Sequence, residues 1–138
     1  MRTIETLDLA EARRALMAMR GELERRGAAA VILVADAHGD PIALERLDGA
    51  PASSVRIASH KAWTAACQAT PSRAIGDRVR SEERLDVAYY GDPRICGWAG
   101  GLPIVRGGHV VGAVAVSGLP EDEDEAVAEV GRRALTGD

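Results

Sequence analysis

The sequence of 138 residues has no phenylalanine, and aromatic residues make up only 3% of it. Hydrophobic residues still reach 46%, so the core must be built from alanine, valine, leucine and isoleucine. Such a content is typical of a globular protein and excludes a disordered chain. The length predicts one domain over residues 1–138, long enough to bury a single sizeable core.

Cysteine is almost as scarce. Cys67 and Cys96 are the only two, and they form no C-x-x-C pair. We therefore expect two free thiols, with a disulfide between them as the alternative. The three histidines, His38, His60 and His109, show no metal-ligand spacing, so the sequence predicts no metal site.

Long apolar runs and clusters of basic residues are missing as well. No run approaches the roughly 20 apolar residues of a membrane span, and the N-terminus lacks an apolar signal segment. The net charge is −4, and lysine and arginine are scattered. We expect neither a membrane nor a nucleic-acid partner, and a cytoplasmic location. The absence of Walker and G-x-G-x-x-G patterns argues against nucleotide binding.

Two hairpins stand out among the features that are present. A buried strand over residues 29–35, a turn at 36–40 and a return strand over 41–47 form the first. Apolar runs on both sides of Arg106-Gly107-Gly108-His109 form the second, because a Gly-Gly pair adopts the positive φ angles of a tight turn. The run at 110–118 is small and β-branched throughout, which predicts a strand covered on both faces.

Helices are predicted around these hairpins at residues 7–26, 54–69, 72–80 and 121–135. The first is expected to begin at Thr6 or Asp8 and to end at Gly27, and the second to be capped by Ser53 or Ser54. Residues 85–90 and 94–98 are predicted as short strands or irregular segments. Hairpins with helices at both ends indicate an α+β fold with an antiparallel sheet.

Six blocks of sequence, in this order, resemble the GlcG/HbpS family and extend from about residue 7 to residue 134. They are VADAHG at 34–39, LDGAP at 47–51, ASHKAWTAA at 58–66, GGLPI at 100–104, VGAVAVSG at 111–118 and EDE at 123–125. The resemblance implies a profilin-like α-β-α sandwich with an antiparallel sheet of about five strands flanked by helices. It also implies a homo-oligomer, an octamer or smaller, and a small-molecule ligand, which is heme in some members.

The chain departs from the family's usual pattern at several positions. His60 precedes Lys61-Ala62 where Asp-Lys-Ala is common, and Pro71-Ser72 stands for Pro-Thr. Cys96 and Trp98 replace simpler apolar residues, and Cys96 is a candidate heme thiolate or nucleophile. These changes indicate either that the shared heme chemistry is lost or that the pocket is specialised.

Lys61 and His60 are the strongest candidates for chemistry. His60 and Thr64 share a helix face, and an imidazole there serves as an axial heme ligand, as an acid or base, or as an ordinary helix residue. Lys61 is expected to hold a carboxylate, to act as a base or nucleophile, or to pair structurally with Asp36 or Asp124. Gly100 and Gly101 are predicted to bring backbone N–H groups against an anion.

Three functions are therefore open. The first is an oligomeric heme-binding or small-ligand-binding protein with His60, Thr64, Gly100 and Gly101 around the ligand. The second is a cofactor-independent enzyme of the isomerase or proton-transfer type, acting on a small oxygenated acid or biosynthetic intermediate, with Lys61 and His60 as acid and base. The third is a structural or regulatory assembly module.

Overall fold

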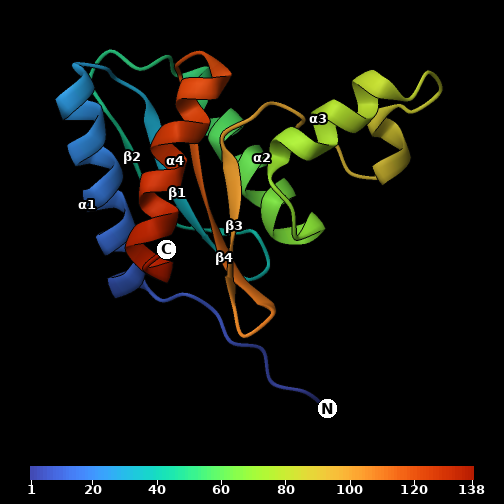
Figure 1. Ribbon diagram of the computed structural model, residues 1–138, viewed down its shortest axis with the longest axis horizontal. Helices are drawn as coiled ribbons and strands as arrows, with labels where there is room; N and C mark the ends of the chain where they lie inside the picture. The colour runs from blue at the N-terminus through green and yellow to red at the C-terminus, as the bar shows by residue number, and fades with distance from the viewer.

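The computed structural model describes residues 1–138 and contains four α-helices, one short 3₁₀ helix and four strands (Figure 1). In chain order these are α1 (Leu9–Arg26), β1 (Val31–Asp36), β2 (Pro41–Arg46), α2 (Ser53–Gln68), α3 (Ser72–Ser81), η1 (Val87–Tyr90), β3 (Gly101–Arg106), β4 (His109–Ser117) and α4 (Glu121–Thr136). The α+β class predicted from the two hairpins is confirmed.

The strands form one antiparallel sheet in the order β2-β1-β4-β3. The sheet has four strands, so the expectation of about five is wrong. Residues 85–98 add no strand because their backbone is used in turns. Asp86 accepts from the Ala88 N–H to begin η1, and Asp92 accepts from the Arg94 N–H at the next turn. Pro93 between them has no N–H to donate to a ladder.

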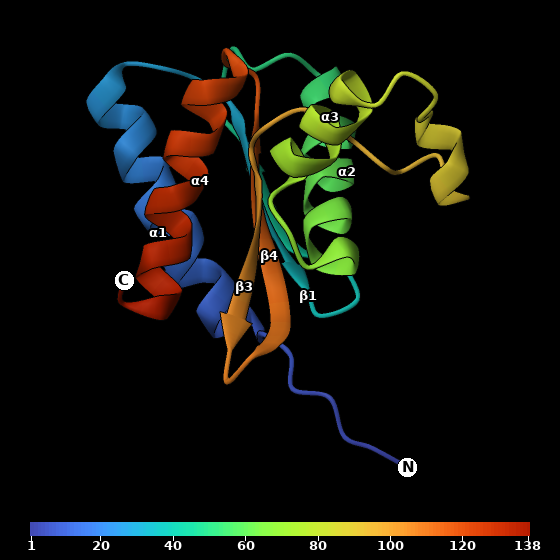
Figure 2. The same cartoon turned by 45° about the vertical axis from the view of Figure 1, so that its right-hand side comes forward.

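The sheet lies between two helical layers, α1 and α4 on one face and α2 on the other (Figure 2). The sequence of strand β1 is a continuous apolar run because its residues pack alternately into the two cores. Ile32 and Val34 belong to the core under α1 and α4, while Val31, Leu33 and Ala35 belong to the core under α2. Each face of the strand is buried, as expected for a sheet covered on both sides.

Helix boundaries follow the sequence at α1 but not at α2. Asp8 accepts from the Glu11 N–H, and Gly27 ends α1 with φ +64°, as predicted. Neither serine caps α2, because Ala52 takes the N-cap position without a side-chain hydrogen bond. Ser54 is instead turned into the interior, with only 3% of its surface exposed.

The segment from α3 to η1 projects from the body of the molecule (Figures 1 and 2). No residue of η1 is buried, and Val87, Tyr89 and Trp98 are large exposed hydrophobic side chains. The chain then returns to the sheet through the corner at residues 98–101, where β3 begins. This corner brings α2, α3, α4 and β4 together and positions the candidate site.

Candidate functional site

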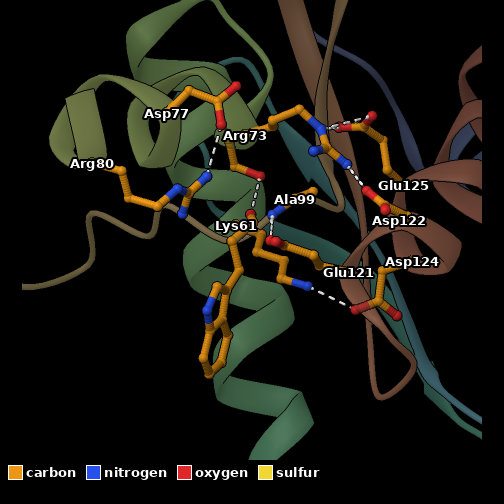
Figure 3. Close-up of polar contacts among 11 residues, drawn as sticks. Lys61, Arg73, Asp77, Arg80, Ala99, Glu121, Asp122, Asp124 and Glu125 are labelled. Carbon is orange, nitrogen blue, oxygen red and sulfur yellow. Dashed lines mark hydrogen bonds and ion pairs between the residues drawn. The ribbon is translucent and has the colours of Figure 1, made fainter.

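Lys61 is buried between α2 and the sheet, with 1% of its surface exposed. Its Nζ donates to the Val116 carbonyl and to Asp124 Oδ2, each at 2.9 Å. Asp124 lies in the first turn of α4, and Figure 3 shows the two side chains pointing toward each other. The ion pair therefore joins the helices on opposite faces of the sheet at the end of β4.

Asp124 is nearly as buried as its partner, at 2% exposure. Its Oδ1 accepts from the Leu119 N–H at 3.0 Å, so it also fixes the connection between β4 and α4. Burial raises the pKa of Asp124, and the charge of Lys61 opposes that rise. The structure thus confirms Asp124 as the structural partner of Lys61. Asp36 instead accepts from the His38 and Asp40 N–H groups in its own turn.

Gly100 and Gly101 provide room for this arrangement. A Cβ on Gly101 would lie 2.3 Å from the Lys61 carbonyl oxygen, and one on Gly100 would lie 2.6 Å from that of Val116. Gly100 also has φ +126°, which L side chains rarely adopt. The Gly101 N–H donates to Ser72 Oγ at 2.9 Å, so it is already used within the chain.

Buried hydroxyls hold the segment around the corner in place. Thr64 Oγ1 donates to the Arg94 carbonyl at 3.2 Å and accepts from the Cys96 N–H at 2.9 Å. Ser72, at the start of α3, donates to the Trp98 carbonyl at 2.6 Å. The sequence predicts that Ser72 begins a helix and stands where the resemblance implies a threonine after Pro71, but no local pattern indicates that its hydroxyl is buried.

Burial raises the pKa of the Cys96 thiol. The protonated form is therefore favoured, which is the opposite of what a nucleophilic or iron-bound thiolate requires.

His60 lies elsewhere, on a side of α2 that opens toward the edge strand β2. It lines a groove of about 890 Å³. We call this the His60 groove, and its lining residues are Pro41, Leu44, Ala52, Ser53, Val55, Arg56, Ile57, Ser59 and His60. The imidazole of His60 makes no hydrogen bond within the chain, and His38, in the β1–β2 turn, and His109, the first residue of β4, are both exposed.

The surroundings of His60 keep its imidazole neutral. Burial lowers the pKa of His60 below its ordinary 6.5, and the positive charges of Arg56 and Arg94 lower it further. A neutral imidazole retains the lone pair that a heme iron binds. Arg56 offers a guanidinium in the same groove for a carboxylate, and Leu44, Val55 and Ile57 offer apolar surface. These residues fit heme in charge and in donor type.

Lys61 faces a different hollow, of about 380 Å³. We call this the Lys61 hollow, and its lining residues are Ser54, Ile57, Lys61, Trp98, Ser117, Gly118, Leu119, Glu121 and Asp124. Ile57 lines both hollows, and Thr64 lines neither. The structure therefore brings Lys61 together with Gly100 and Gly101, but it places His60 apart from them. Ligand binding or catalysis by these residues stays a prediction.

None of the helices is both long enough and apolar enough to cross a membrane. No group of three or more histidine, cysteine, aspartate and glutamate side chains is arranged to hold a metal ion.

Comparison with known proteins gives consistent matches. A family model described as haem-degrading protein HbpS-like matches residues 7–133. An uncharacterised 15.0 kDa protein from the dhaT–dhaS intergenic region of Citrobacter freundii is 32% identical over 127 residues, which cover 91% of this chain and 89% of the relative. Protein GlcG of Escherichia coli is 30% identical over 96 residues, covering 70% of this chain and 69% of GlcG.

Solved structures also superimpose on this chain over nearly its whole length. The Klebsiella pneumoniae protein ORFY superimposes with a TM-score of 0.92 at 27% identity, covering 100% of this chain and 96% of ORFY. The structure of a PduOC–heme complex superimposes with a TM-score of 0.86 at 22% identity, covering 94% of each chain. That likeness shows a shared fold.

Proposed function

This chain belongs to the HbpS-like family, and on that premise we propose that it is a heme-binding protein whose ligand occupies the His60 groove. The observation that carries the proposal is the partly buried imidazole of His60, which has no partner in the chain and a lowered pKa. Family membership adds support, because the family is described by heme degradation and a protein of the same fold has a heme complex.

In this proposal the imidazole of His60 would hold the heme iron and Arg56 would pair with a propionate. The apolar residues of the groove, Leu44, Val55 and Ile57, cover part of the porphyrin face. When bound, heme supplies the redox and oxygen chemistry of its iron. The contribution of the protein is to hold an unprotonated nitrogen in the groove and to supply positive charge beside it.

Titration with hemin, followed by the Soret absorbance, tests the proposal. We expect a shifted and saturable band for the unaltered protein. The His60→Ala variant should lose the shift or bind at least about tenfold more weakly, since it removes the iron ligand. His109→Ala is the matched control, because His109 is exposed at the start of β4, away from the groove, and should leave the band unchanged. An unshifted band, or equal effects of the two substitutions, would count against the proposal.

The alternative of a cofactor-independent enzyme with Lys61 and His60 as acid and base finds no support. Both hydrogen bonds of Lys61 are to groups of the chain itself. His60 lies in the other hollow, so the two side chains do not converge on one substrate.

We also propose that the chain forms a homo-oligomer. The support is the exposed apolar surface of the projecting segment, at Val87 and Tyr89 of η1, which a second copy would remove from water. Light scattering on the purified protein should give a mass that is a multiple of 14.5 kDa. Tyr89→Arg should lower that mass, and a monomeric unaltered protein would contradict the proposal.

A further inference from the structure

The Lys61 hollow contains polar groups that the fold leaves without partners. An ammonium group has three N–H donors, and Lys61 uses two of them, on Val116 and Asp124. Ser54 and Ser117 are 3% and 4% exposed, yet the hydroxyl of neither makes a hydrogen bond within the chain. All three side chains line the same hollow. The two serine hydroxyls are not among the fully enclosed atoms that lack a partner, so they open into the hollow, where a ligand can pair with them.

The charges around the hollow restrict what that ligand can be. Lys61 and Asp124 neutralise each other, which leaves the carboxylate of Glu121 as the remaining charge among the lining residues. Glu121 accepts from the Ala99 N–H through Oε2 at 2.9 Å, as Figure 3 shows, while Oε1 makes no hydrogen bond. Glu123 follows in the same helical turn, while Asp122 between them is paired with Arg73. A carboxylate or phosphate would be repelled by these acids.

The remaining walls are apolar. Ile57 comes from α2 and Leu119 from the connection before α4. Trp98 contributes an indole that is 56% exposed. An apolar wall beside a few unpaired polar groups is typical of a small-molecule site.

We propose that the Lys61 hollow binds a small neutral molecule with hydroxyl groups on one side and a carbon skeleton on the other. A hydroxyl group both donates and accepts, so it can accept from Lys61 and the serines and donate to Glu121. The carbon skeleton then lies against Trp98. This site is separate from the His60 groove, and Ile57 is the residue that lines both.

Trp98 provides the signal for a test. Trp63 and Trp98 are the only tryptophans, so a Trp63→Phe background leaves Trp98 as the single indole. We expect titration with glycerol or erythritol to change its fluorescence saturably. Ser54→Ala and Ser117→Ala, each made in that background, should weaken binding about tenfold by removing one hydrogen bond. Ser53→Ala is the matched control, since Ser53 lies next to Ser54 but outside the hollow.

Circular dichroism establishes that each variant is folded, and having two independent serine variants keeps the test valid if one of them is not. The proposal is overturned if neither polyol gives a saturable change, or if both serine variants bind like Ser53→Ala. It is also overturned if acetate or ethylammonium saturates the signal and the polyols do not. Hemin binding is read separately by the Soret band, and Ser117→Ala should leave that band unchanged.

Discussion

At the scale of single residues, the ion pair between Lys61 and Asp124 has the largest electrostatic consequence. Both charges are removed from water, and each loses a hydration shell that only the partner and the nearby backbone replace. A buried charge that loses its partner remains desolvated and uncompensated. The pair is therefore expected to behave as one unit in unfolding.

A double-mutant cycle measures that coupling. Lys61→Met keeps the length of the side chain, and Asp124→Asn keeps the Oδ1 that accepts from Leu119. Each single variant should lower the free energy of unfolding by about 3–5 kcal/mol, because the other charge is left buried and alone. The double variant should lose at least about 1 kcal/mol less than the sum, as measured by urea denaturation. Additive losses would show that the charges are not coupled.

His60 predicts a pH dependence of stability. Its pKa is about 6.5 in the unfolded chain and lower in the folded protein, because burial and Arg56 disfavour the charged imidazole. Between these two values the unfolded state binds more protons, so the free energy of unfolding should fall as the pH drops below 6.5. At higher pH the residue should have no such effect.

The check is urea denaturation of the His60→Gln variant on both sides of pH 6.5, with His109→Gln as the exposed control. Replacing His60 should remove part of the acid-side loss of stability, and replacing His109 should not. If the profile of His60→Gln coincides with that of the unaltered protein, the imidazole is not held in its neutral form.

Residue-level prediction from the sequence succeeded where the local pattern limits the choice. A lysine in an alanine-rich helix needs an acidic partner, and Asp124 was one of two candidates. The strand end at Ser117-Gly118 does indicate a hydroxyl that can face a ligand, but Ser54 and Ser72 could not be identified as buried in this way, because serines occur on any surface. Their burial depends on how α2, α3 and β4 approach each other, which no local pattern determines.

At the scale of elements, the close approach of α2 to the sheet depends on small side chains. Ala58, Ala62 and Ala65 have no exposed surface and pack on the centre of the sheet. Where α2 passes the start of β3, even a methyl group is too large, and Gly101 lies against the Lys61 backbone. The backbone of a helix cannot move away as a flexible side chain can.

Replacing Gly101 with alanine tests this packing. The added Cβ would lie 2.3 Å from the Lys61 carbonyl oxygen, so α2 must shift and the free energy of unfolding should fall by about 1–3 kcal/mol or more. Gly21→Ala is the control, because nothing lies within 4 Å of a Cβ on Gly21 in the middle of α1. That substitution should stabilise the protein by about 0.5–1 kcal/mol. The measurement is the thermal unfolding of both variants. A loss of stability in Gly21→Ala alone would contradict the close packing of Gly101 against α2.

Element prediction worked best where periodicity and turn chemistry agree. The β3–β4 hairpin was predicted from Gly107 and Gly108, which have φ +56° and +79° in the structure. Residues 81–99 were the weakest part of the prediction, because short apolar runs there are compatible with either a strand or a turn. The carboxylates of Asp86 and Asp92 accept hydrogen bonds from backbone N–H groups two residues on, which favours the turns, and for that reason the expected fifth strand does not form.

At the scale of the whole molecule, the three layers leave α2 with a hollow on each side of Ile57. One faces the edge strand β2 and contains His60, and the other faces the start of α4 and contains Lys61. The sequence had placed all the candidate residues around one ligand. Their separation follows from helix geometry, because His60 and Lys61 are adjacent in α2 and so point about 100° apart around its axis.

A crystal structure of the protein grown with hemin is the most direct test of heme binding in the His60 groove. We expect porphyrin density between α2 and β2, with the iron bonded to the imidazole of His60 and a propionate beside Arg56. Density in the Lys61 hollow, or iron bonded to a residue other than His60, would contradict the proposed site.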